Sequence, residues 1–209
     1  MIKAVLFDLD NTLLDFMKMK QNAISAALDS MIFSGLDIDK EQAEKKIYKI
    51  YDNHGYEYQE VFDLFLTELI GKVDYKILAK GIISYKKAKE DSLSLYKNVN
   101  STLVSLSKLG LKIGVISDAP SREAWMRIYY LNLHHSFDTV ITFDDSGERK
   151  PSPAPFKLAL EKLDLSKDEV LMVGDWPERD MVGANSMGIK TIFAKYGDAF
   201  GVKHSGADW

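Results

Sequence analysis

The 209-residue chain contains no cysteine, which excludes disulfide bonds, thiolate metal sites and a cysteine nucleophile. It also has little net charge. Its 27 basic and 31 acidic residues give −4, and a mildly acidic chain does not offer the basic face that nucleic acids require. No apolar run approaches the roughly 18 residues of a membrane span. These absences predict a cytoplasmic protein with no nucleic-acid partner and no membrane partner.

Five short apolar runs, most of them ending at a polar turn, have the length and the Val and Ile content of buried parallel strands. They are Ile2–Leu9, Leu111–Ser117, Phe137–Phe143, Glu169–Val173 and Lys190–Ala194. Segments with helical spacing alternate with the later runs: Val99–Leu109, Ser121–Leu133 (with Trp125, Ile128, Tyr129 and Leu133 at helical spacing), Pro153–Leu163 and Met181–Met187. This alternation predicts an α/β fold, with a Rossmann-like parallel sheet covered by helices on both faces.

Residues 16–97 interrupt the alternation, because no clear buried strand lies among them. Four amphipathic segments occur instead: Asn22–Phe33, Lys40–Tyr51, Tyr58–Ile70 and Tyr75–Leu95. Asp39 and Gln42 fit a capping box at the start of the second segment. We interpret residues 16–97 as an α-helical cap inserted into a core of residues 1–15 and 98–209. An insertion at this point would lie over the C-terminal ends of the strands, where open α/β sheets bind ligands.

Polar side chains follow the first two predicted strands. Asp8 and Asp10 come after the first strand, and alternation along an extended chain places them on the same side. One carboxylate could attack phosphorus while the other handles the proton of the leaving group. Ser117 follows the second strand, where a hydroxyl group and the N–H groups of a following helix would form an anion site.

Two further polar clusters follow the third and fourth predicted strands. Lys150 could neutralise the charge of a phosphate and of a nucleophile together. Asp175 is placed to bind a hard cation, and Asp180 could orient a neighbouring ligand or the lysine. Each of the four clusters alone also fits a helix cap, a turn or a solvated lysine. Chance does not readily bring all four to the same edge of one parallel sheet.

These clusters resemble, in sequence order, the four motifs of the haloacid dehalogenase superfamily of hydrolases. The matching residues are Asp8-x-Asp10-x-Thr12, Ser117, Lys150 before Pro151, and Gly174-Asp175-x-x-x-x-Asp180. The resemblance extends from Met1 to about Tyr196. Within the family, the chain is similar to archaeal members that act on glyceraldehyde 3-phosphate or phosphoglycolate. The resemblance also implies a further strand and helix beyond Ala207-Asp208-Trp209, where this chain stops.

The resemblance implies a role for each motif residue. Asp8 would be the nucleophile that forms an aspartyl-phosphate, and Asp10 would protonate the leaving alcohol and then activate water. Ser117 would hold a phosphoryl oxygen, and Lys150 would balance charge. Mg²⁺ would be held by Asp8, Asp10 through its backbone carbonyl, and Asp175, with Asp180 assisting. The predicted substrate contacts are Asn11, Thr12, Asp118, Ala119 and, from the cap, His54.

The leading hypothesis is a phosphatase for a small phosphorylated metabolite, acting as a monomer or homodimer. Asp10 favours it over a dehalogenase, because an alkoxide leaving group needs a proton and a halide does not. A phosphomutase would use the same aspartyl-phosphate but return the phosphoryl group to a sugar, and a transfer assay with a sugar bisphosphate would separate the two. A third hypothesis is an inactive binding or regulatory module on this fold. The complete set of acids, serine and lysine argues against it.

Overall fold

The computed structural model describes residues 1–198, and the chain forms two compact units. One unit contains Met1–Phe16 and the chain from Leu93 onward, and the other is Met17–Ser92. The segment Ala207–Trp209, beyond which a further strand and helix were expected, lies outside the described residues. Among residues 1–198, none of the helices combines the length and the apolar character needed to cross a bilayer.

The first unit is built on a five-stranded parallel sheet with the order β3-β2-β1-β4-β5. The strands are β1 (Ala4–Phe7), β2 (Lys112–Ile116), β3 (Thr139–Ile141), β4 (Val170–Gly174) and β5 (Lys190–Phe193). In the central strand, Val5 is in register with Ile113 of β2 and with Leu171 of β4. All four side chains of β1 are buried, as expected for a strand covered on both faces. The predicted α/β fold with a parallel sheet is confirmed.

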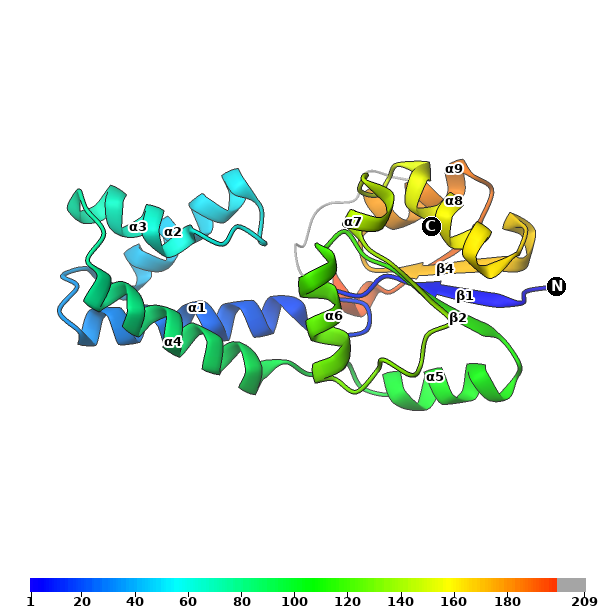
Figure 1. The fold of residues 1–209 in the computed structure, drawn as a ribbon, viewed down its shortest axis with the longest axis horizontal. Helices are drawn as coiled ribbons and strands as arrows, with labels where there is room; N and C mark the ends of the chain where they lie inside the picture. Colours follow the sequence, from blue (N-terminus) through cyan, green and yellow to red (C-terminus); the bar gives the residue numbers. More distant parts are fainter. Residues whose placement is uncertain (199–209) are drawn as a thin grey trace. The chain divides into compact units, whose positions relative to one another are not determined.

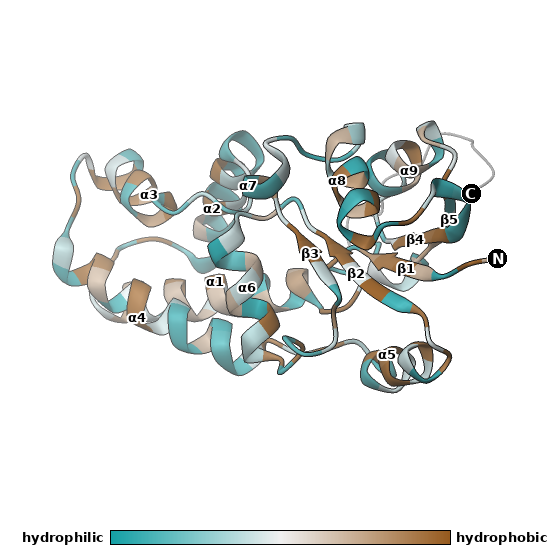
Figure 2. Cartoon of the chain, turned by 45° about the vertical axis from the view of Figure 1, so that its right-hand side comes forward, coloured by the Kyte–Doolittle hydropathy of each residue, from teal (hydrophilic) through white to brown (hydrophobic). Residues whose placement is uncertain are grey.

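Helices cover both faces of this sheet. Helices α8 (Pro153–Leu163) and α9 (Val182–Ser186) lie on one side, and α5 (Val99–Lys108) lies on the other (Figure 1). The side chains of Leu6, Met172 and Phe156 belong to one buried apolar cluster, which joins β1 and β4 to α8. Figure 2 shows the apolar residues concentrated along the central strands. The remaining elements of this unit are α6 (Ser121–Tyr130), α7 (Phe143–Ser146), the 3₁₀ turns η1 (Lys167–Glu169) and η3 (Lys195–Gly197), and the π-helical turn η2 (Pro177–Met181).

The third strand is shorter than its apolar run predicted. It ends at Ile141 because Thr142 caps a short helix that the sequence pattern did not reveal. The backbone N–H and the hydroxyl of Thr142 donate to Asp145 Oδ2 at 2.8 and 2.7 Å. This capping box begins α7 at Phe143, a residue that had been assigned to the strand.

Helix α6 buries only some of the large residues that have helical spacing in the sequence. Ile128 is buried, whereas Trp125 and Tyr129 are 38% and 60% exposed. The buried residues of this helix are Glu123, Ala124, Arg127 and Ile128. The guanidinium of Arg127 takes an interior position because it forms an ion pair with Asp10.

The second unit is built from four α-helices. Its helices are α1 (Phe16–Phe33), α2 (Lys40–His54), α3 (Val61–Ile70) and α4 (Tyr75–Ser92). They enclose a core that includes Leu28, Ile47, Phe65 and Leu78, separate from the cluster of the sheet. Asp39 Oδ1 accepts a hydrogen bond from the backbone N–H of Gln42 at 3.1 Å, which confirms one of the two hydrogen bonds of the predicted capping box.

Helix α2 extends further than its predicted end at Tyr51. It reaches His54 and ends at Gly55, whose φ of 86° favours glycine. His54 is therefore the last helical residue, and it does not lie in a loop as the sequence pattern suggested. The interhelical segment begins only after it.

The chain leaves the sheet unit and returns to it through paired segments. Leu14 and Leu95 form an isolated antiparallel bridge. On either side of this bridge, the N–H of Asp15 donates to the carbonyl of Ser94 at 3.1 Å, and the N–H of Tyr96 donates to that of Leu13 at 3.0 Å. These contacts all lie within the unit that contains the sheet, and they hold the two ends of the inserted segment together.

Candidate active site

The first part of the candidate site is the tight loop that follows β1. The N–H of Asp8 still donates to the carbonyl of Val173 in β4 at 2.8 Å, so the sheet itself positions this residue. The chain then turns at Asn11, which has a φ of 62° and donates its N–H to the carbonyl of Leu14 at 2.7 Å. Asparagine tolerates this left-handed conformation better than most residues. The turn leaves Asp8 buried at the carboxyl end of the central strand.

Lys150 lies at the centre of the site, with only 2% of its side chain exposed. Its Nζ is 2.5 Å from Asp8 Oδ1 and 2.6 Å from Asp180 Oδ1. The same ammonium donates to the carbonyl of Ile116, the last residue of β2, at 3.0 Å. One side chain thus joins the segments that follow β1, β3 and β4 to the end of β2.

Two aspartates from the segment after β4 complete this cluster. Asp175 Oδ1 accepts a hydrogen bond from the Thr12 hydroxyl at 3.1 Å. Asp180 lies in η2, and its Oδ2 accepts from the backbone N–H of Trp176 at 3.0 Å. Gly174 makes room for Asp180, because a Cβ atom at this position would overlap the Asp180 carboxyl group.

The charges of the cluster do not balance. Carboxylate oxygens of Asp8, Asp175 and Asp180 lie within 4.8 Å of one another, and all three residues are buried. Among residues 1–198, one lysine ammonium pairs with this cluster, so three ionised carboxylates would leave it with two excess negative charges. Like charges this close repel unless a proton or a cation lies between them. Hard oxygen ligands of this kind suit a divalent cation such as Mg²⁺ or Ca²⁺.

The pKa values reflect this imbalance. Burial raises the pKa of Asp175 to about 7, the charge of Asp180 adds to the rise, and Lys150 opposes it. Burial likewise raises the pKa of Asp8 well above its usual range, against the lowering effect of Lys150. For Lys150, burial alone lowers the pKa, but the charges of Asp180 and Asp8 raise it above its usual value, so the ammonium stays protonated. Without a cation, Asp175 is therefore about half protonated at neutral pH.

The residues after β2 lie beside this cluster. Ser117 is buried directly after Ile116, and its Oγ accepts a hydrogen bond from the N–H of Ala119 at 3.2 Å. Asp118 Oδ1 accepts from the backbone N–H of Lys150 at 2.9 Å, and its Oδ2 accepts from Arg179 Nη1 at 3.1 Å. Asp118 therefore fixes the lysine-bearing segment to the segment after β2. Phosphate contacts by these residues remain predictions.

His54 belongs to the helical unit, and the residues of the carboxylate cluster belong to the unit that contains the sheet. Its ring stacks on that of Tyr58, with the ring centroids 4.5 Å apart. Contact between His54 and a substrate stays a prediction.

Asp10 has a different environment from the three clustered carboxylates. Its side chain is 22% exposed, and its Oδ2 lies 2.7 Å from Nη1 of Arg127. The guanidinium carbon of Arg127 is 4.7 Å from the centroid of the Phe16 ring. Asp10 was predicted from the sequence, whereas its partner Arg127 was not.

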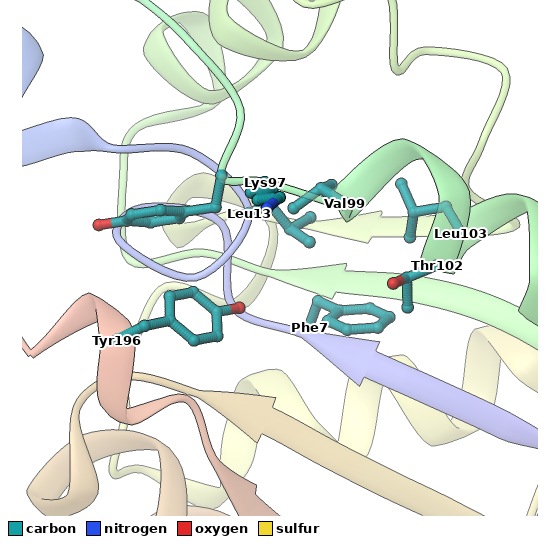
Figure 3. A pocket seen from close by; sticks show the side chains of 8 residues that line it. Phe7, Leu13, Lys97, Val99, Thr102, Leu103 and Tyr196 are labelled. Carbon is teal, nitrogen blue, oxygen red and sulfur yellow. The ribbon is translucent and has the colours of Figure 1, made fainter.

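A pocket of about 290 Å³ lies near the loop that follows β1 (Figure 3). Phe7, Leu13, Val99 and Leu103 give it mostly apolar walls. Tyr196, which also lines it, donates its hydroxyl to the Thr12 carbonyl at 2.8 Å. Lys97 also lines this pocket, whereas the clustered Asp8, Lys150 and Asp175 are not among its lining residues.

The fold and the cluster agree with the comparison of this chain with known proteins. The haloacid dehalogenase-like hydrolase family matches residues 5–194, and the chain belongs to this family. The predicted resemblance is therefore confirmed.

Individual relatives include enzymes named for phosphate chemistry. The glyceraldehyde 3-phosphate phosphatase of Methanocaldococcus jannaschii is 38% identical over 192 residues, which cover 92% of this chain and 84% of that protein. The pyrophosphatase PpaX of Bacillus cereus is 30% identical over 197 residues, with 91% and 82% covered. A crystal structure of a HAD phosphatase from Thermococcus onnurineus is similar with a TM-score of 0.68 and 26% identity, covering 92% of this chain and 86% of that one.

Proposed function

We propose that this protein is a magnesium-dependent phosphatase that hydrolyses a small phosphate ester through an aspartyl-phosphate on Asp8. The observation that carries the proposal is the buried Lys150 ammonium, which contacts both Asp8 and Asp180 in a cluster that also contains Asp175. Such a site can neutralise an incoming phosphoryl group beside a carboxylate nucleophile. The relatives that are named phosphatases support the same reaction class.

In the first proposed step, a carboxylate oxygen of Asp8 attacks phosphorus. The bond from phosphorus to the ester oxygen breaks, and its electron pair stays on that oxygen. Asp10 supplies the proton that converts the departing alkoxide into an alcohol. Lys150 offsets the negative charge that gathers around phosphorus.

In the second step, the oxygen of a water molecule attacks the same phosphorus atom. Asp10, now ionised, takes a proton from that water, and the bond between phosphorus and Asp8 breaks. Inorganic phosphate leaves, and both aspartates return to their starting states. The net reaction consumes one ester and one water and yields one alcohol and one phosphate.

Mg²⁺ fits the chemistry of the buried oxygen cluster. Asp8 and Asp175 would hold it with the backbone carbonyl of Asp10, and Asp180 would assist. When bound, it would withdraw charge from the phosphoryl oxygens and bring the nucleophile and phosphate together.

The proposed substrate is a small phosphorylated metabolite in the cytoplasm, and glyceraldehyde 3-phosphate is the first candidate because of the named relative. Ser117 would hold a phosphoryl oxygen. The proposed additional contacts are Asn11, Thr12, Asp118, Ala119 and, from the helical unit, His54.

A phosphate-release screen tests this function. Wild-type protein, Asp8→Asn and the exposed-site control Asp168→Asn would be assayed with Mg²⁺ on sugar phosphates, glyceraldehyde 3-phosphate, phosphoglycolate and pyrophosphate. We expect metal-dependent release by the wild type and the control, and a loss of about a thousandfold or more in Asp8→Asn, because that variant lacks the attacking carboxylate. Equal release by wild type and Asp8→Asn, or release by wild type that persists in EDTA, would overturn the proposal.

A further inference from the structure

Arg127 is a buried charged residue that the proposed chemistry does not yet use. It lies on α6, and only 2% of its side chain is exposed. Its Nη1 donates to Asp10 Oδ2 at 2.7 Å, and its guanidinium lies over the ring of Phe16. An arginine is costly to bury, and well-packed apolar residues often replace a buried ion pair without loss of stability. Stability alone therefore does not explain why this position of α6 carries a guanidinium.

The geometry of the pair explains what the guanidinium does. Asp10 follows the nucleophile by two residues, on the short loop that turns at Asn11. Its side chain is partly exposed and could adopt other rotamers, whereas Arg127 is fixed by its burial and by the Phe16 ring. The ion pair therefore restricts the rotation of the Asp10 carboxyl group, because its Oδ2 is bound to a side chain that α6 holds in place.

We propose that Arg127 is a positioning residue for the acid and base Asp10. It holds the Asp10 carboxyl group where its proton passes to the ester oxygen as the bond to phosphorus breaks, and where it receives the proton of the attacking water. This inference rests on the proposed phosphatase function. Proton transfer requires the two heavy atoms within hydrogen-bonding reach, so a carboxyl group that rotates away loses most of its effect.

A purely structural role for Arg127 predicts a different result. If the ion pair only anchored α6, its loss would disturb the loop and lower activity on every ester by a similar factor. If it positions the acid, the loss depends on the leaving group. An alkoxide needs a proton as it departs, and a nitrophenolate does not.

Steady-state kinetics on two substrates separate these roles. The kcat/KM of Arg127→Met and Arg127→Lys would be measured on an alkyl ester, glyceraldehyde 3-phosphate, and on p-nitrophenyl phosphate. The matched control is Arg122→Met, an exposed arginine on the same helix. We expect Arg127→Met to lose about a hundredfold on the alkyl ester and less than about tenfold on the aryl ester. Arg127→Lys should recover part of the loss, and Arg122→Met should match the wild type on both.

A double-mutant cycle with Asp10→Asn completes the test. Asp10→Asn removes the proton carrier, so Arg127→Met should have little further effect in that background. Equal losses on the two esters, or losses that simply multiply in the double variant, would overturn the inference. Should Arg127→Met fail to fold, Arg127→Lys keeps the test open, because a displaced cation still predicts the larger loss on the alkyl ester. Failure of the phosphatase proposal shows separately, as equal activity of wild type and Asp8→Asn.

Discussion

Asp175 ties the protonation of the site to the stability of the protein. Its pKa of about 7 in the folded state lies above the usual aspartate value of about 3.9 expected when the chain is unfolded. The folded state therefore holds a proton that the unfolded state releases. This contribution to stability is complete below about pH 4 and is lost as the pH rises through about 7.

The metal-free protein should therefore lose stability as the pH rises between about pH 4 and about pH 7, by up to about 1.4 kcal/mol per pH unit from this group. Mg²⁺ should restore stability most at high pH, because protons compete with it for the carboxylates. Urea unfolding in EDTA and in Mg²⁺ across this range measures both effects. Asp175→Asn should flatten the slope in EDTA and reduce the gain from Mg²⁺. A gain from Mg²⁺ that does not change with pH would contradict this prediction.

At the residue level, the sequence predicted the members of the site better than their partners. Asp8, Ser117, Lys150 and Asp175 each follow a strand, and parallel strands bring their carboxyl ends to one edge. Arg127 was not predicted because it lies within a helix, and a lone charged residue in a helix is usually exposed to solvent. The available signal for its burial was its position, three residues after Ala124 and next to Ile128. Its meaning depends on Asp10, a residue far away in the sequence.

At the scale of elements, Gly174 links the end of β4 to the π-helical turn that carries Asp180. Gly174→Ala should displace the Asp180 carboxyl group, because the new methyl group would occupy its place. We expect a clear loss of activity at saturating Mg²⁺, about tenfold or more, since Asp180 contacts Lys150 directly. Phosphate release by the folded fraction, determined beside urea unfolding, measures this effect.

Gly114→Ala is the comparison for this prediction. A Cβ atom there would press on Leu6 and Thr139 inside the sheet, away from the carboxylate cluster. It should destabilise the protein by about 1–3 kcal/mol but leave the activity of the folded fraction near that of the wild type. The prediction for Gly174 fails if the two variants differ only in stability.

The places of the strands in the sequence and the parallel type of the sheet were predicted, but the ends of the strands were not. Buried parallel strands are nearly continuous apolar segments, so β1, β2 and β4 stand out in the sequence. The third run extended through Phe143, and nothing in its hydropathy marks where the strand stops. The side-chain hydrogen bonds of Thr142 and Asp145 decide that point, and a capping box this close to an apolar run is easily overlooked.

At the scale of the whole molecule, the two compact units have separate apolar cores. Hydrogen exchange followed by mass spectrometry should therefore respond locally to Mg²⁺. We expect slower exchange in the segments after β1 and β4, which carry Asp8 and Asp175, because bound cation stabilises those loops. Exchange within α2 and α3 should stay unchanged. Protection of similar size in α2 and α3 would show that the metal site and the helical core are energetically coupled.

The helical character of residues 16–97 was evident from the sequence, because no run within it alternates or stays apolar long enough for a buried strand. The compact units divide at Phe16 and Leu93, so residues 93–97 go with the sheet. Backbone bonds such as that from Tyr96 to Leu13 cause this difference, and a hydropathy pattern does not report them.

The paired segments at Leu14 and Leu95 have a consequence for how this protein can vary. Because they fix both ends of the insertion side by side, the sheet is affected by the intervening chain mainly through the entropy of closing a loop. That entropy changes slowly, by about 0.6 kcal/mol for each doubling of length. Evolution or design could therefore shorten, extend or exchange the inserted helices while the aspartates and lysine stay in place.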